Sequence, residues 1–264
     1  MKRVLSSVLL LPILIAVIYF GSPVVFYLVV LAAVLLGIYE YFALISEIGI
    51  TGFPVMGFVL SFLLTLCFYF GGQFLAQWIL AATVLLFLAW FVLEKDIRTA
   101  FDQIAYTFLG IFYVAGLLGS FVLIRNLAEG QYYVFFVLLV VWLGDTAAYY
   151  VGRNFGRHPL APVISPKKTV EGAVAGLTGS LAGGWIAQLW FLPDVALAHC
   201  LIMALICGMI GQFGDLAESL LKRSARAKDS GSLIPGHGGI LDRIDGLLFA
   251  GPAFYGYYTG VLSP

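Results

Sequence analysis

Apolar stretches of about 20 residues recur along this 264-residue chain, and they restrict its fold more than any other feature. A helix of that length crosses the roughly 30 Å of hydrocarbon in a bilayer. Of all residues, 62% are hydrophobic and 11% are charged, whereas soluble domains are typically about half apolar and about a quarter charged. The chain is therefore predicted to be an all-α, polytopic integral membrane protein. A membrane β-barrel would alternate apolar and polar residues in segments of about ten, and no such pattern dominates here.

The hydrophobic windows predict about nine transmembrane helices. They are expected near residues 4–20, 23–46, 52–70, 74–93, 104–124, 131–151, 172–192, 197–214 and 246–262. The first window resembles a signal peptide, but its apolar run is long and no clear cleavage site follows, so we interpret it as a retained span. We divide the chain into residues 1–130, with helices one to five, and residues 131–264, with helices six to nine and the charged loops.

The placement of lysine and arginine supports this count. With the N-terminus in the cytoplasm, 13 of the 14 basic residues fall on the cytoplasmic side and only Arg125 falls outside. The formal net charge is zero, so no nucleic-acid partner is expected. Cys67, Cys200 and Cys207 lie inside apolar windows and are expected to be core residues, not disulfides or metal ligands.

Two predicted cytoplasmic loops, 142–172 and 211–246, hold most of the distinctive polar chemistry. The acidic residues in or beside the membrane there are Asp145, Asp215, Glu218, Asp242 and Asp245. A carboxylate at such depth is costly unless it is paired, hydrated or bound to metal. Carboxylate oxygens suit Mg²⁺, which often bridges substrate phosphates, and the neighbouring basic residues suit the rest of a polyphosphate. The pattern favours phosphoryl or nucleotidyl transfer at the membrane face.

Each of these residues also has a plainer interpretation. Asp242 and Asp245 are equally consistent with caps of the last span, and Asp215 with an ion pair to Lys222. The basic run of Lys222, Arg223, Arg226 and Lys228 is also typical of sites for anionic lipid headgroups. The run PGHGG at 235–239 is not a Walker loop, yet its glycines would let backbone N–H groups approach phosphate oxygens. Glu40 and Glu94 lie close to span ends, where they would simply reach water.

Taken together, residues 219–245 resemble the signature of the phosphatidate cytidylyltransferase (CDP-diacylglycerol synthase) family. The matching positions are Ser219, Lys222, Arg223, Lys228, Asp229, His237, Gly238, Gly239, Asp242, Arg243 and Asp245. The segments GDTAAYYVGRNFGRH and SPKKTVEG, earlier in the chain, also resemble family segments. Many members carry an aromatic residue where Val170 stands here.

The resemblance implies that CTP and phosphatidic acid give CDP-diacylglycerol and pyrophosphate, with one or two divalent cations, Mg²⁺ among them. It implies metal ligands at Asp215 and Asp242, with Asp145 and Asp245 as further ligands or as residues that orient them. Catalytic or phosphate-binding roles would fall to Lys222, Arg223, Lys228 and Arg243, while Lys167 and Lys168 would cover the nucleotide. Asp229, His237, Gly238 and Gly239 match the motif and would belong to the substrate-binding residues, with no specific role assigned to Asp229 and His237. The enzyme would lie in a bacterial-type plasma membrane, with its site facing the cytoplasm, and a homodimer is one state open to it.

Other functions stay open at this point. A CTP-dependent lipid kinase, or a cytidylyltransferase for another lipid phosphate, would use a similar charged surface. A CDP-alcohol phosphotransferase is disfavoured because the D-G-x-x-A-R run is absent after Asp245. A secondary transporter with Asp145 and Asp215 as cation sites is disfavoured because the charges gather towards one face and no internal repeat is visible.

Overall fold

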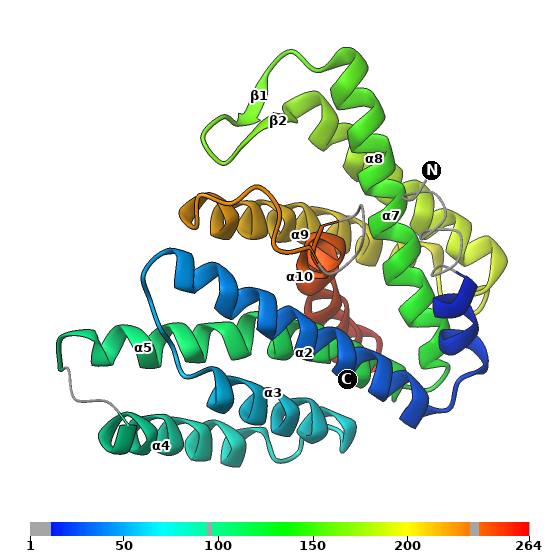
Figure 1. Cartoon of the computed structure of the whole chain (residues 1–264). Helices are drawn as coiled ribbons and strands as arrows, with labels where there is room; N and C mark the ends of the chain where they lie inside the picture. Colours follow the sequence, from blue (N-terminus) through cyan, green and yellow to red (C-terminus); the bar gives the residue numbers. More distant parts are fainter. Residues whose placement is uncertain (1–11, 94–96, 233–237, 264) are drawn as a thin grey trace. The chain divides into compact units, whose positions relative to one another are not determined.

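The computed structural model describes residues 12–93, 97–232 and 238–263, and helices account for most of them (Figure 1). Internal contacts divide the chain into two compact units. Unit 1 comprises Met1–Asn126 and Ser224–Arg243, and unit 2 comprises Leu127–Arg223 and Ile244–Pro264. Both units are therefore discontinuous in sequence. The segment Ser224–Arg243 belongs with the N-terminal helices.

Unit 1 is a group of apolar helices. After a helical stretch at 12–20 come α2 (Pro23–Glu47), α3 (Pro54–Tyr69), α4 (Leu75–Leu93), α5 (Ile97–Gly110), the π-helix η1 (Ile111–Gly116) and α6 (Leu117–Arg125). Helix α2 begins at a proline, whose fixed φ and missing N–H suit the first helical turn. The hydroxyl of Ser22 caps this helix by accepting the N–H of Val25 at 3.4 Å.

Close helix packing in unit 1 depends on aromatic rings that lie against glycines. The ring of Tyr41 on α2 covers Gly110, and the ring of Phe42 covers Gly57, so a Cβ at either glycine would strike the ring. The hydroxyl of Tyr41 donates to the carbonyl of Tyr106 on α5 at 2.8 Å, which satisfies a polar group in an apolar interior. Helix α2 also packs against α3, η1 and α6, so it contacts much of the unit.

Unit 2 contains α7 (Gly130–Phe155), α8 (Val170–Trp190), most of α9 (Leu197–Ser224), most of α10 (Leu241–Tyr257) and the π-helix η2 (Tyr258–Leu262). Between α7 and α8 the chain forms an antiparallel hairpin of β1 (Pro159–Ala161) and β2 (Ser165–Thr169). Pro159 pairs with Thr169 and Ala161 with Ser165, with an irregular register between them. Figure 1 shows this hairpin at the end of the α7–α8 pair.

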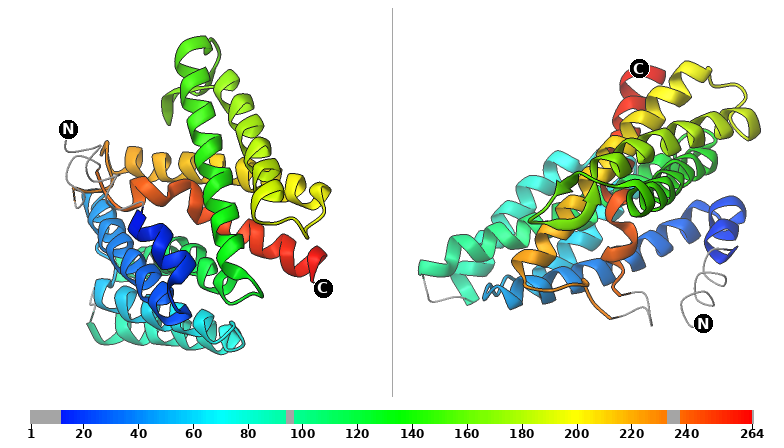
Figure 2. Two further views of the ribbon diagram at one scale, coloured as in Figure 1. Left: turned by 90° about the vertical axis from the view of Figure 1, so that its right-hand side faces the viewer. Right: turned by 90° about the horizontal axis from the view of Figure 1, so that it is seen from above.

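Helices α7 and α8 run side by side (Figure 2). Glycines bring their backbones together: a Cβ on Gly179 would lie 2.6 Å from the carbonyl oxygen of Leu143, and one on Gly172 would lie 2.9 Å from that of Ala148. The hydroxyl of Ser180 donates to the carbonyl of Val140 at 3.1 Å across the same interface. This tight pair is the frame on which the hairpin and the charged end of α7 are held.

The prediction of an all-α polytopic membrane protein is confirmed. In the described part of the chain, five helices are long and apolar enough to span a bilayer: Pro23–Glu47, Leu75–Val92, Ile97–Arg125, Gly130–Phe155 and Leu197–Ser224. Helix α3 is apolar but shorter, and the described helices follow the predicted windows from 23 onward. The count of nine spans, the cytoplasmic N-terminus and the division at residue 130 stay predictions.

The helix ends differ from the predicted windows where polar residues continue a helix. The fifth window was expected at 104, but the helix begins at Ile97, and the added polar turn includes the buried Gln103. The eighth window was expected to end at 214, but α9 continues to Ser224. Hydropathy alone does not detect such polar turns, because it follows the apolar run and not the hydrogen-bonded backbone.

Candidate active site

Asp215 on α9 lies beside a lysine from the hairpin. The Nζ of Lys168 is 2.5 Å from Oδ2 of Asp215, and the two side chains are 26% and 34% exposed. Lys167, the preceding residue on β2, is exposed, as expected for alternating positions on a strand. The two predicted nucleotide-binding lysines therefore differ in environment, since Lys168 pairs with an acidic residue and Lys167 is exposed.

Further acidic residues surround Asp215. It lies close enough to interact electrostatically with Asp145 on α7 and with Asp245 on α10, and Lys168 also interacts with Asp145. Oδ1 of Asp245 accepts the N–H of Gly246 at 2.8 Å. Three helices thus place carboxylates within electrostatic range of one another, and neighbouring negative charges favour a bound cation.

Glu218 and Lys222 form a second ion pair on α9, one turn apart. The carboxyl group of Glu218 is fully buried, the side chain of Lys222 is 13% exposed, and Glu218 also interacts with Asp245. Sequence reasoning left open a pair between Asp215 and Lys222. In the structure Lys222 pairs with Glu218, and Asp215 pairs with Lys168.

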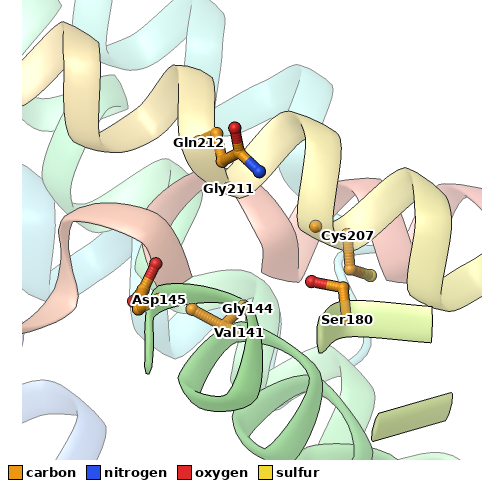
Figure 3. A pocket seen from close by; sticks show the side chains of 8 residues that line it. Val141, Gly144, Asp145, Ser180, Cys207, Gly211 and Gln212 are labelled. Carbon is orange, nitrogen blue, oxygen red and sulfur yellow. The ribbon is translucent and has the colours of Figure 1, made fainter. Parts of the chain in front are cut away.

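A small pocket lies next to Asp145 (Figure 3). Its volume of about 10 Å³ is close to the minimum for one water molecule. Its lining comes from α7, α8 and α9: Val141, Gly144, Asp145, Ser180, Cys207, Gly208, Gly211 and Gln212. The amide of Gln212 donates to the carbonyl of Ala173 at 3.1 Å. With this volume, the pocket next to Asp145 is too small for a nucleotide.

The hairpin is tied to α8 and α9 by side chains. Nε of Arg223 donates to the carbonyl of Ile164, between the strands, at 3.3 Å. Glu171, one residue before the predicted span 172–192, accepts the N–H of Arg157 at 3.1 Å and of His158 at 3.2 Å. The Arg157 backbone bond and the His158 side chain at 2.5 Å lower the pKa of Glu171 to about 2. These contacts hold the strand that carries Lys168.

In unit 1, Asp242 organises the loop before α10. We call residues 228–232 and 238–243 the anchored loop. Oδ2 of Asp242 accepts the N–H of Ser230 at 2.8 Å, the hydroxyl of Ser230 at 3.0 Å and the N–H of Gly239 at 2.9 Å. This aspartate therefore acts as a helix-start residue in the structure, which was the plainer of its two interpretations, and its role as a metal ligand stays a prediction.

The glycines of the anchored loop are explained by backbone geometry and close approach. Gly238 has φ +81°, and a Cβ there would lie 2.7 Å from Oδ2 of Asp242. A Cβ on Gly239 would strike Ser230 and Glu40. Because the Gly239 N–H is donated to Asp242, it does not serve as the phosphate-binding backbone donor that the sequence suggested.

The remaining predicted residues of this loop carry charge on the surface. Lys228, Asp229 and Arg243 are exposed. His237 lies outside the described residues, as do Glu94 and the basic residues Lys2, Arg3 and Lys95. Their roles as ligands stay predictions, and sequence reasoning did not identify what holds them in place.

Glu40 is the residue that sequence reasoning missed, because it was expected to reach water. In the structure it is 1% exposed and accepts the N–H of Ile240 at 2.8 Å and of Leu241 at 3.0 Å. It also accepts the hydroxyl of Ser230 at 2.9 Å. The one available signal was an acidic residue inside an apolar window of α2, which is a costly position without a partner.

Mg²⁺ is the cation whose chemistry matches these donors. Within residues 12–93, 97–232 and 238–263, no three acidic, cysteine or histidine side chains already converge closely enough to hold an ion. The ammonium group of Lys168 instead supplies positive charge beside Asp215. The carboxylates of Asp145, Asp215 and Asp245 are oxygen donors, the type of ligand that Mg²⁺ prefers, and their role as its ligands stays a prediction.

Comparison with known proteins agrees with this chemistry. The chain is 45% identical over 173 residues to the phosphatidate cytidylyltransferase of Staphylococcus saprophyticus, covering 66% of this chain and 65% of the relative. It is 42% identical over 173 residues to the phosphatidate cytidylyltransferase of Bacillus subtilis, covering 65% of this chain and 64% of the relative. The match thus spans slightly less than two thirds of these curated relatives. The sequence model of the Cytidylyltransferase family matches residues 1–261, and the chain therefore belongs to the cytidylyltransferase family.

Proposed function

We propose that this protein is a phosphatidate cytidylyltransferase, which converts CTP and phosphatidic acid to CDP-diacylglycerol and pyrophosphate. The observation that carries the proposal is that Asp145, Asp215 and Asp245, from three helices, lie within electrostatic range of one another, with Lys168 of the hairpin paired to Asp215. Carboxylates for a cation and a lysine for a phosphate are the two kinds of group that a metal–triphosphate substrate requires. The printed names of the relatives from Staphylococcus saprophyticus and Bacillus subtilis support the choice of these substrates.

In the proposed reaction, a phosphate oxygen of phosphatidic acid attacks the α-phosphorus of CTP. A new phosphorus–oxygen bond forms, the bond from the α-phosphorus to the β-bridging oxygen breaks, and pyrophosphate leaves with the bonding electron pair. The attacking oxygen is already an anion, so no strong general base is needed. The protein's contribution is then mainly to position the two anionic substrates and to neutralise their charge.

In our proposal, charged side chains position the substrates and neutralise their charge. When bound, Mg²⁺ would neutralise phosphate charge, held by Asp215 with Asp145 and Asp245. As the substrate binds, the ammonium group of Lys168 would leave its ion pair with Asp215 and pair with a phosphate oxygen instead. Lys222 and Arg223, at the end of α9, would face phosphate groups near the membrane surface.

The anchored loop would supply further cations through Lys228 and Arg243, since the N–H groups of residues 239–241 are occupied by carboxylates. If Asp242 is a ligand of Mg²⁺, its carboxylate is already oriented by the N–H groups of Ser230 and Gly239. A site that faces the cytoplasm in a bacterial plasma membrane, and a homodimer, complete the proposal.

The test is incorporation of radiolabelled CTP into lipid by purified protein, with phosphatidic acid supplied in detergent, with and without Mg²⁺. We expect label in the lipid, release of pyrophosphate and a requirement for Mg²⁺. Release of CDP together with an unlabelled lipid would indicate a lipid kinase instead, and solute uptake into vesicles without turnover would indicate a transporter.

Two variants test the predicted metal ligands. Asp215→Asn and Asp242→Asn should each remove most CTP-dependent turnover, because an amide is a poorer ligand for Mg²⁺ than a carboxylate. Asp194→Asn is the matched control, because Asp194 is exposed in the turn between α8 and α9. Near-normal turnover by both folded variants would refute the ligand assignment.

A further inference from the structure

A carboxylate from α2 holds together a loop that lies about 200 residues later in the chain. Glu40 lies inside a span with a mean hydropathy of 2.3, and its side chain is 1% exposed. Oε1 accepts the N–H of Ile240, and Oε2 accepts the N–H of Leu241 and the hydroxyl of Ser230. Both oxygens are therefore used by the segment that precedes and begins α10.

The loop is shaped to receive this carboxylate. Gly231 and Gly239 lie against it: a Cβ on Gly231 would be 2.8 Å from Oε1, and one on Gly239 would strike Oε2. Ser230 is 4% exposed and its hydroxyl lies 2.9 Å from Glu40 and 3.0 Å from Asp242. Glu40 and Asp242 thus share the hydroxyl of one serine.

The same loop carries the exposed charges that the proposed function uses. Asp229 directly precedes Ser230, Lys228 comes one residue earlier, and Arg243 directly follows Asp242. A loop whose backbone is fixed at residues 230, 239, 240 and 241 holds these side chains close to one geometry. Preorganised charges of this kind bind and stabilise a phosphate better than mobile ones.

We propose that Glu40 is a positioning residue of the active site, which acts through Ser230, Ile240 and Leu241 to fix the phosphate-facing charges of the anchored loop. This inference rests on the proposed function. Glu40 touches neither the substrate nor the metal in this account. Its role is to hold the loop in the arrangement that receives CTP.

Glutamine cannot reproduce this anchor even though it has the same shape. A Gln side chain offers one oxygen, and its NH₂ group must face at least one of the N–H donors that now point at the carboxylate. Two donors that face each other leave a buried N–H without an acceptor. Glu47, near the end of the same helix, is exposed, so Glu47→Gln is the matched control.

The experiment compares the full-length wild-type protein, Glu40→Gln and Glu47→Gln in detergent, with two readouts. Hydrogen exchange measures the amides of residues 239–241, and steady-state kinetics measure kcat and KM for CTP per folded molecule. In Glu40→Gln we expect these amides to exchange at least about tenfold faster, with α3 unchanged, since opening would be local. We also expect KM for CTP to rise about tenfold, while Glu47→Gln matches the wild type.

Every outcome decides between the alternatives. Unchanged exchange at 239–241 overturns the anchor, and faster exchange with an unchanged KM overturns the positioning role, because a merely structural residue alters only the amount of folded enzyme. If Glu40→Gln does not fold, Ser230→Ala removes the shared hydroxyl, and it must show the same faster exchange and raised KM or the proposal fails. A wild-type protein without CTP turnover refutes the proposed function, whereas the exchange measurement still decides whether Glu40 holds the loop.

Discussion

Replacing Lys168 with methionine tests whether the lysine beside Asp215 serves catalysis or stability. The two side chains are 26% and 34% exposed, so water and salt screen their attraction. Ion pairs with such exposure contribute about 0–1 kcal/mol to stability, and the hairpin is also held by Glu171 and Arg223. Lys168→Met should therefore fold.

The expected effect on turnover is much larger than the effect on stability. Removal of one preorganised group that stabilises developing charge typically lowers kcat by about 10²–10³-fold. Lys167→Met is the matched control, because Lys167 is the adjacent lysine on β2 and is exposed. We expect Lys168→Met to lose about 10²-fold or more of its turnover, and Lys167→Met to retain most of it.

The assay is transfer of label from CTP to lipid, with each rate divided by the amount of protein that elutes as a folded species. The reasoning is refuted if Lys167→Met loses as much turnover as Lys168→Met, or if folded Lys168→Met keeps normal turnover. A Lys168→Met protein that unfolds would also contradict the argument, because the exposure of the ion pair predicts a small contribution to stability.

Two further predictions concern stability and pH. Gly239→Ala should destabilise the anchored loop by roughly 1–3 kcal/mol, since its Cβ strikes neighbouring polar groups. Gly256→Ala in α10, whose Cβ meets open space, should cause no loss of stability, because alanine favours a helix over glycine. Thermal unfolding of both variants checks this. The folded pKa of Glu171, about 2, lies below its ordinary value of 4.5, so its contribution to hairpin docking is fully present above pH 4.5 and is lost as the pH falls from 4.5 through 2. The protection factors of the amides of residues 157 and 158, which correct for the intrinsic pH dependence of exchange, should fall over that range in the wild type, and Glu171→Gln should show low protection at every pH.

The helices were predictable because the apolar windows are long and strongly patterned. Helix α2 was expected at 23–46 and occupies Pro23–Glu47, and α4 was expected at 74–93 and occupies Leu75–Leu93. The π-helix at Ile111–Gly116 was not predictable, since an extra residue per turn leaves the same apolar composition. The hairpin of β1 and β2 was not expected either, because its short strands are polar and lie within a charged loop.

The candidate site was predictable in its residues but not in its partners. Buried or membrane-depth acids such as Asp145 and Asp215 are visible in a sequence because they interrupt apolar runs. The choice of Lys168 over Lys222 as the partner of Asp215 depends on where β2 lies relative to α9, which no local pattern encodes. Glu40 was missed for the same reason, since its donors are 190 to 201 residues away in the chain.

That separation affects the order in which the protein can be made. At about 5–20 residues per second, the ribosome needs about 10–40 s to synthesise the 200 residues between Glu40 and Ile240. During that time the carboxylate of Glu40 lies in an apolar helix without the donors that it has in the folded protein. The contacts of Glu40 can form only after the segment from Ser230 to Leu241 has been made. A fragment that ends before residue 230 would lack those donors permanently, so the carboxylate of Glu40 would stay without these three partners.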